Sequence, residues 1–118
     1  MHCRAIVVGL LLFFPTLSWG HEAKKAPIPS KEAQAKIEKL LDELYKDDFA
    51  KAEKDAVLRA RLAQTLLFEG KETKDDAAGR YVLFSKAHLL AAQAGAVETA
   101  LQAADELANG FLIPAGAV

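Results

Sequence analysis

The sequence predicts an all-α domain of about four helices, arranged as two antiparallel hairpins in a layered stack or a small bundle. Three observations predict this class. The chain contains no proline between Ser30 and Pro114, and proline is the residue that helix interiors tolerate least. The same stretch is rich in Ala, Leu, Lys and Glu, which favour helices. Its apolar residues recur at three- and four-residue steps, and no alternating strand pattern competes with them.

The first twenty residues have the three parts of a secretory signal peptide. Arg4 supplies the positive charge, residues 5–17 are almost entirely apolar, and Ser18 and Gly20 are small residues at the −3 and −1 positions of a cleavage site. The alternative is an uncleaved membrane anchor. The apolar stretch is, however, shorter than the roughly 20 residues that a membrane-spanning helix needs. We therefore expect export to the periplasm or the extracellular space.

Composition excludes several classes of function. The chain has 118 residues, which suits one domain. Without residues 1–20 it carries 14 Lys and Arg against 16 Asp and Glu, a net charge of −2, so a nucleic-acid partner is not expected. Cys3, the only cysteine, leaves with the signal peptide, so neither a disulfide nor a structural zinc site is expected. We expect no cofactor, and no membrane contact after cleavage.

Two helices are expected in the first half of the mature chain. Residues 21–29 are expected to be an extended linker, because prolines disfavour helix in the residue before them. The first helix begins at Ser30, a good N-cap, and ends between residues 46 and 48. The second spans about 50–69 and closes at Gly70. It carries two apolar rows, which are Ala56, Ala60, Ala63 and Leu67, and Leu58, Leu62 and Leu66. Such a helix is expected to lie between two neighbours.

Two further helices complete the predicted domain, which spans residues 30–111. The third begins at Asp75 or Asp76 and ends at Gly95, because glycine is favoured just past a helix end. It too is apolar on two sides. The fourth spans about 96–108 and is apolar on one side only. Its expected core stripe consists of Val97, Ala100, Leu101, Ala104, Leu107 and Phe111. Residues 112–118 form an apolar C-terminal tail.

The third and fourth helices resemble a tetratricopeptide-type hairpin. The matching positions are Gly95 at the turn, Ala100 at the small site where the helices cross, and Tyr81 and Phe84 as large residues of the first helix. His88 stands where that repeat usually has a small residue, and Ala104 where it usually has a large one. The resemblance implies helical hairpins that stack side by side.

Three segments, 46–52 (KDDFAKA), 72–83 (ETKDDAAGRYVL) and 98–107 (ETALQAADEL), carry a resemblance that covers roughly residues 30–111. They resemble a helical region behind the signal peptide of large secreted planctomycete proteins, where it often precedes other domains. The resemblance implies no activity and no catalytic residue. It also implies that related chains continue beyond Phe111, so that this one is a truncated or abbreviated member.

Two histidines are candidates for sites of chemistry. After cleavage, His21 would be the N-terminal residue, and such a residue can hold copper together with a second histidine. The remaining candidate, His88, is expected within a packed helix, so we interpret His21 as an incidental linker residue. Ser85 and His88 are three residues apart and can approach each other. An orienting acid and an oxyanion hole are not evident around them, which favours a packing role.

Charged and glycine residues at helix boundaries have simpler explanations than catalysis. The pairs Asp47–Asp48 and Asp75–Asp76 lack the ligand spacing of a calcium loop and are interpreted as helix caps. Gly79 is unexpected in the first turns of a helix, and a close neighbour or a delayed helix start would explain it. Arg80 and Lys86 are interpreted as a solvated edge.

These observations favour a non-enzymatic, exported helical module for protein interaction or spacing. Its expected partner is another protein or a following domain. One alternative is an enzyme or a small-ligand carrier with a site between the helices, lined by Tyr81, Phe84 and His88. The other is a fragment of a larger secreted protein. No catalytic, cofactor-binding or metal-binding residue is assigned.

Overall fold

The computed structural model describes residues 25–112, and almost all of this span is helical. Its helices are α3 (Lys31–Leu44), α4 (Lys46–Lys54), α5 (Ala56–Glu72), α6 (Ala77–Ala94) and α7 (Val97–Gly110). The all-α prediction is confirmed for this part of the chain. The predicted signal peptide, His21 and most of the predicted C-terminal tail lie outside the described residues.

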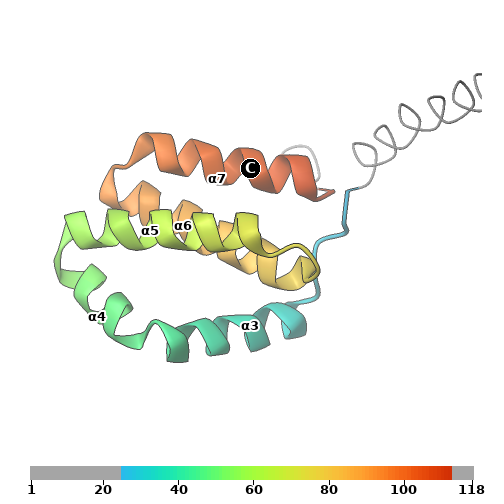
Figure 1. Ribbon diagram of the computed structural model, residues 1–118, viewed down its shortest axis with the longest axis horizontal. Helices are drawn as coiled ribbons and strands as arrows, with labels where there is room; N and C mark the ends of the chain where they lie inside the picture. Colours follow the sequence, from blue (N-terminus) through green and yellow to red (C-terminus); the bar gives the residue numbers. More distant parts are fainter. Residues whose placement is uncertain (1–24, 113–118) are drawn as a thin grey trace, which may run out of the picture.

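Helix α6 occupies the centre of the arrangement and packs against α3, α5 and α7. Helices α5, α6 and α7 follow one another in alternating directions, while α3 and α4 form a bent cover on the other side (Figure 1). Helix α3 packs on α6 and α4, whereas α4 packs on α5. The first predicted hairpin therefore differs from the observed one, because the partner of α5 on this side is the short helix α4.

The core lies where these helices meet and is built from small and large apolar residues in two groups. The larger group joins α3, α4, α5, α6 and α7, and its buried members are Leu41, Ala52, Leu62, Leu66, Leu67, Val82, Leu83, Phe84, Ala87 and Ala103. The smaller group consists of Ala63, Ala91 and Ala100, one from each of α5, α6 and α7. Leu90 and Ala96, which are partly buried, pack against these alanines, and small side chains at a helix contact let the backbones approach closely.

The predicted second helix is divided in two by Asp55. The Asp55 carboxylate accepts hydrogen bonds from the backbone N–H groups of Val57 (2.8 Å) and Leu58 (3.4 Å), so it caps a new helix. Residues 46–54 therefore form α4, separated from α3 by Tyr45 (φ −113°, ψ 29°). The expected start of the second helix near residue 50 is wrong for this reason.

The end of α5 also lies beyond the predicted one. Gly70 is a buried residue inside the helix, and the chain leaves the helix only at Thr73. A side chain at position 70 would meet the Phe84 ring of α6, because its Cβ would lie 2.5 Å from the nearest ring carbon. Gly70 thus allows a close aromatic contact and does not stop the helix.

The predicted core stripe of the last helix is only partly correct. Ala100 is buried as expected, and Thr99 and Ala103 are buried beside it. Val97 and Leu101 were expected in the core, but they are 66% and 61% exposed. Helix α7 is turned so that its small residues face α5 and α6, which leaves its bulkier row toward solvent.

Three predicted helix boundaries are confirmed with their hydrogen bonds. The Ser30 hydroxyl accepts from the Ala33 N–H at 3.1 Å, and an Asp76 oxygen accepts from the Gly79 N–H at 2.9 Å. Gly95 is left-handed (φ 76°), and it and Ala96 donate to the last turn of α6. This pattern is a Schellman motif, which requires a residue that adopts positive φ at low cost.

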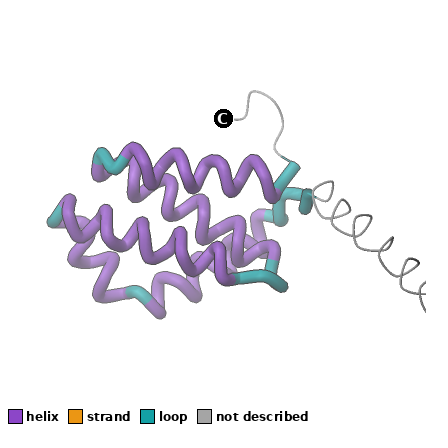
Figure 2. Tube along the Cα trace, turned by 45° about the horizontal axis from the view of Figure 1, so that its top comes forward, coloured by secondary structure: helices purple, strands orange, loops and turns teal. Residues whose placement is uncertain are grey.

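The two ends of the described chain are tied together. The Ala26 N–H donates to the Gly110 carbonyl, and the Leu112 N–H donates to the Ala26 carbonyl, both at 2.9 Å. Figure 2 shows these segments side by side at one end of the bundle. Residues 25–29 are non-helical, as expected for the predicted linker, and Ala26 is fixed to the domain.

Candidate functional site

The three residues that were expected to line a site between helices are separated by the packing. Phe84 is buried, and Tyr81 packs edge to face on Phe111, with ring centroids 5.2 Å apart. His88 lies on the surface and is linked through Nδ1 to the Ala100 carbonyl of α7 at 3.1 Å. Neither the hollow beside Arg59 nor the one beside Arg80 has more than one of the three in its wall.

The contact of His88 argues for a structural role. A carbonyl oxygen can only accept a hydrogen bond, so Nδ1 must carry the proton that it donates. The ring thereby joins α6 to α7, and its hydrogen bond goes to Ala100 and not to Ser85. Ser85 is half-buried, whereas the expectation that His88 is packed within its helix is wrong, because His88 is exposed.

The acidic pairs occupy helix starts. Asp76 caps α6, whereas Asp47 and Asp48 lie in the first turn of α4 and make no side-chain cap hydrogen bond. The predicted role of Asp47 and Asp48 as helix caps is therefore wrong, although carboxylates in a first turn suit the helix dipole. Across residues 25–112, no group of three or more His, Cys, Asp or Glu side chains is placed to hold a metal ion.

Gly79 is explained by the cap of its own helix. A Cβ at position 79 would lie 2.6 Å from Oδ2 of Asp76. Glycine at this position leaves room for the orientation in which the carboxylate reaches the backbone N–H. Neither a close neighbouring helix nor a delayed helix start is needed to explain Gly79. The aspartate three residues before the glycine was the sequence signal for this cap.

The side chain of Arg59 holds the ends of two helices. Its guanidinium donates to the carbonyls of Ala52 (2.8 Å) and Glu53 (3.1 Å) in α4, and to that of Gln93 (3.5 Å) in α6. Carbonyls at helix C-terminal ends lack helical partners and carry partial negative charge. Arg59 also lines a hollow of about 470 Å³ with apolar side chains, which include Phe49, Leu89 and Leu90. No pattern in the sequence predicted a role for Arg59.

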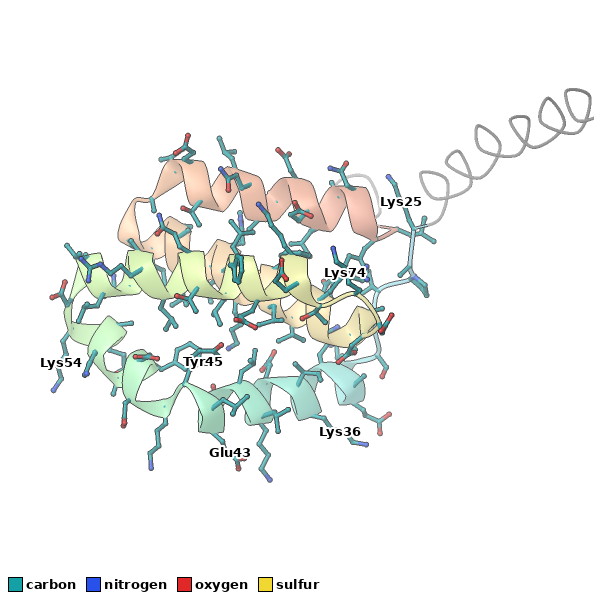
Figure 3. All side chains as sticks on the ribbon, in the orientation of Figure 1. Lys25, Lys36, Glu43, Tyr45, Lys54 and Lys74 are labelled. Carbon is teal, nitrogen blue, oxygen red and sulfur yellow. The ribbon has the colours of Figure 1, made fainter. Side chains whose placement is uncertain are left out.

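Tyr45 lies between the bend of α3 and α4 and helix α5, where it packs against the edge of the core (Figure 3). Burial raises the pKa of its phenol above the usual value, and the negative charges of Glu69 and Asp48 raise it further. Both effects disfavour the phenolate.

Helix α7 presents an apolar row to solvent, which we call the outer stripe. It consists of Val97, Leu101, Ala104 and Ala108, at steps of three and four residues. The two large members are more than half exposed. The remaining surface of α7 carries Glu98, Asp105 and Glu106, and the helix contains no Lys or Arg. Apolar contact area and negative charge therefore lie on the same element.

Helix α3, at the opposite edge, has a smaller feature of the same kind. Leu40 and Leu44 are 53% and 70% exposed and lie one turn apart. Unlike α7, this helix carries lysines as well as carboxylates, among them Lys36 and Lys39. The two outermost helices thus both expose leucines, but they differ in charge.

Comparison of the chain with family models, with curated proteins and with solved structures gave no match. The two resemblances noted from the sequence therefore stay predictions. Among the described helices, none combines the length and the hydrophobicity that a bilayer crossing requires.

Proposed function

We propose that this chain is a non-enzymatic, exported helical module that binds another protein through the outer stripe of α7. The observation that carries the proposal is the exposure of Val97 and Leu101 on a helix whose opposite side is fully packed. Fully burying an exposed Val or Leu side chain contributes about 1.5–3 kcal/mol, and covering these partly exposed side chains contributes a share of that. Folding leaves these side chains exposed, so a binding partner would be what buries them.

The spacing of the outer stripe specifies the kind of partner. Positions 97, 101, 104 and 108 are separated by four, three and four residues, which is the pattern of an amphipathic helix against a helical partner. The acidic surroundings on α7 favour a partner with Lys or Arg beside its apolar row. A second copy of the chain would bring like charges together, so we expect a different protein.

The alternating helices fit the stacking of a tetratricopeptide-like unit. In such stacks each hairpin covers its neighbour and leaves an extended surface for ligands. We propose that α5, α6 and α7 stack in this way and that the partner packs on the exposed face of α7. Export follows from the predicted signal peptide, and the planctomycete resemblance is consistent with such a role.

The test uses matched charge substitutions in the mature protein. Leu101→Glu changes the outer stripe, whereas Val57→Glu changes an equally exposed position on α5. Each bait would be incubated with envelope extract, and the captured proteins would be quantified by mass spectrometry. We expect a specific protein to be retained by the wild type and by Val57→Glu and to be lost with Leu101→Glu.

Circular dichroism of each variant checks that the fold persists. Recovery of nothing specific by the wild type would count against an interaction module. Equal recovery by both variants would show that the contact surface lies elsewhere than on α7.

A further inference from the structure

A second hollow lies at the other end of the bundle, where the end of α5, the start of α6 and the end of α7 meet. It has a volume of about 310 Å³, at the lower limit of the size range of small-ligand sites. Its wall consists of Gly70, Lys71, Thr73, Lys74, Arg80, Phe84, Glu106, Asn109 and Gly110. Figure 3 shows Lys74 between the end of α5 and α7.

The charge of this wall differs from that of the whole protein. Three cations, Lys71, Lys74 and Arg80, face one carboxylate, Glu106, which leaves a local charge of +2. The chain as a whole has a net charge of −1. Glu72, Asp75 and Asp76 neighbour these lysines in the sequence and keep their negative charges, but they are not part of the wall. A concentration of like charge on an otherwise acidic protein has a cost that an anionic ligand would relieve.

Arg80 is held in position before any ligand arrives. Its guanidinium carbon lies 5.3 Å from the centroid of the Phe111 ring, a cation–π distance. One of its nitrogens also approaches the Lys74 carbonyl, at 3.4 Å. Phe111 is itself only 1% exposed, and it packs against Tyr81, so the platform under Arg80 is rigid. A positioned guanidinium retains N–H donors that fit two oxygens of one anion.

We propose that this hollow binds the phosphate group of a small soluble ligand, with Arg80 as the orienting donor and Lys71 and Lys74 as charge partners. A phosphate monoester carries about −1.5 to −2 charges at pH 7, which matches the local +2, whereas a carboxylate neutralises half of it. The hollow adjoins the C-terminal end of α7, whereas the large residues of the outer stripe, Val97 and Leu101, lie in the first half of that helix, and neither lines the hollow. It also revises the view of Arg80 as a merely solvated edge.

The test titrates inorganic phosphate into the purified isotope-labelled protein at constant ionic strength and follows backbone amide signals. We expect saturable shifts at Gly70, Asn109 and Gly110, and no saturable shift with acetate. The variant Lys71→Gln with Lys74→Gln should weaken phosphate binding by about tenfold or more, because it removes two charge-assisted contacts. Both lysines are exposed, so the fold is expected to persist.

Lys36→Gln with Lys39→Gln is the matched control, since it removes two exposed lysines from α3 and should leave phosphate binding unchanged. Shifts that stay linear in phosphate, or that are equal in the two double variants, would overturn the proposal. So would co-sedimentation of the wild type with vesicles that contain phosphatidic acid, if the Lys71 and Lys74 variant abolished it, because the phosphate would then belong to a lipid.

Discussion

At the scale of single residues, the contact of Gly70 with Phe84 illustrates how packing reverses a local preference. Glycine inside a helix costs about 1 kcal/mol relative to alanine, so Gly70 weakens α5 when that helix is considered alone. The missing side chain is the space that the Phe84 ring occupies. The ring is buried at the centre of the bundle, and its packing compensates for the weaker helix.

Gly70→Ala is therefore expected to destabilise the protein by about 1–3 kcal/mol, as overpacking does in a filled core. Gly110→Ala is the control, because its Cβ would meet a nitrogen of Arg80 at an ordinary 3.6 Å. We expect that substitution to be neutral or to stabilise α7 by up to about 1 kcal/mol. Urea unfolding measures both, and a stabilised Gly70→Ala protein would contradict the packing argument.

Tyr45 makes stability depend on pH in the alkaline range. Its pKa is higher in the folded than in the unfolded chain because of burial and then of Glu69 and Asp48. The folded protein therefore holds the phenolic proton more tightly, and stability falls as the pH rises above about 10, the unfolded pKa.

Tyr45→Phe removes this ionisable group. Comparison of the wild type with the variant separates its effect from that of the lysines, which lose protons in the same pH range. The difference in unfolding free energy between the wild type and Tyr45→Phe should be constant below pH 9 to 10 and should shift in favour of the variant at higher pH. Urea titrations across that range measure it. A difference that is the same at all pH values would mean that Tyr45 is as solvated as in the unfolded chain.

At the scale of elements, α4 depends on its neighbours. It has nine residues, which is too short for an isolated helix to persist in water. Tyr45, at its N-terminal end, provides no side-chain cap. Two of its C-terminal carbonyls, those of Ala52 and Glu53, accept hydrogen bonds from Arg59, which reaches back from α5 and also bonds the Gln93 carbonyl at the end of α6.

Arg59→Met keeps an unbranched side chain but removes these donors. We expect a loss of about 1–2 kcal/mol, and faster amide hydrogen exchange in α4 than in α5. Arg61→Met, at an exposed position of the same helix, should have little effect. Hydrogen exchange with mass spectrometry provides the measurement, and uniform acceleration along the whole chain would contradict a role specific to α4.

At the scale of the whole molecule, the described chain is closed by a contact between its two ends. The bonds of Ala26 with Gly110 and Leu112 join segments that are more than eighty residues apart in the sequence. Phe111, between the two C-terminal partners, is buried against Tyr81 and Arg80. The end of α7 is thus held by the segment that precedes α3.

Ala26→Pro removes the N–H that donates to Gly110 and leaves the carbonyl that accepts from Leu112. We expect a loss of about 1 kcal/mol, the contribution of a typical hydrogen bond, and faster exchange of the Leu112 amide. Ala26→Ser retains the N–H and serves as the control. If the two variants unfold at the same urea concentration, the contact of the ends contributes nothing to stability.

The sequence by itself determined the helical class and those boundaries that depend on a few adjacent residues. Ser30, Asp76 and Gly95 act through hydrogen bonds or backbone conformations within one turn, so the local sequence contains all the information that they need. Asp55 acts in the same way, and its position before an apolar run was a signal that the prediction of a longer helix overlooked.

Only the tertiary structure decided which face of each helix is buried and which residues lie together. The rotation of α7 depends on the small contact between Ala63, Ala91 and Ala100, three residues far apart in the chain. The continuation of α5 through Gly70 depends on Phe84, and the hollow around Arg80 depends on the ends of three helices. Periodicity identifies an apolar row, but the neighbour's shape selects which row is covered, and that shape is set by distant residues.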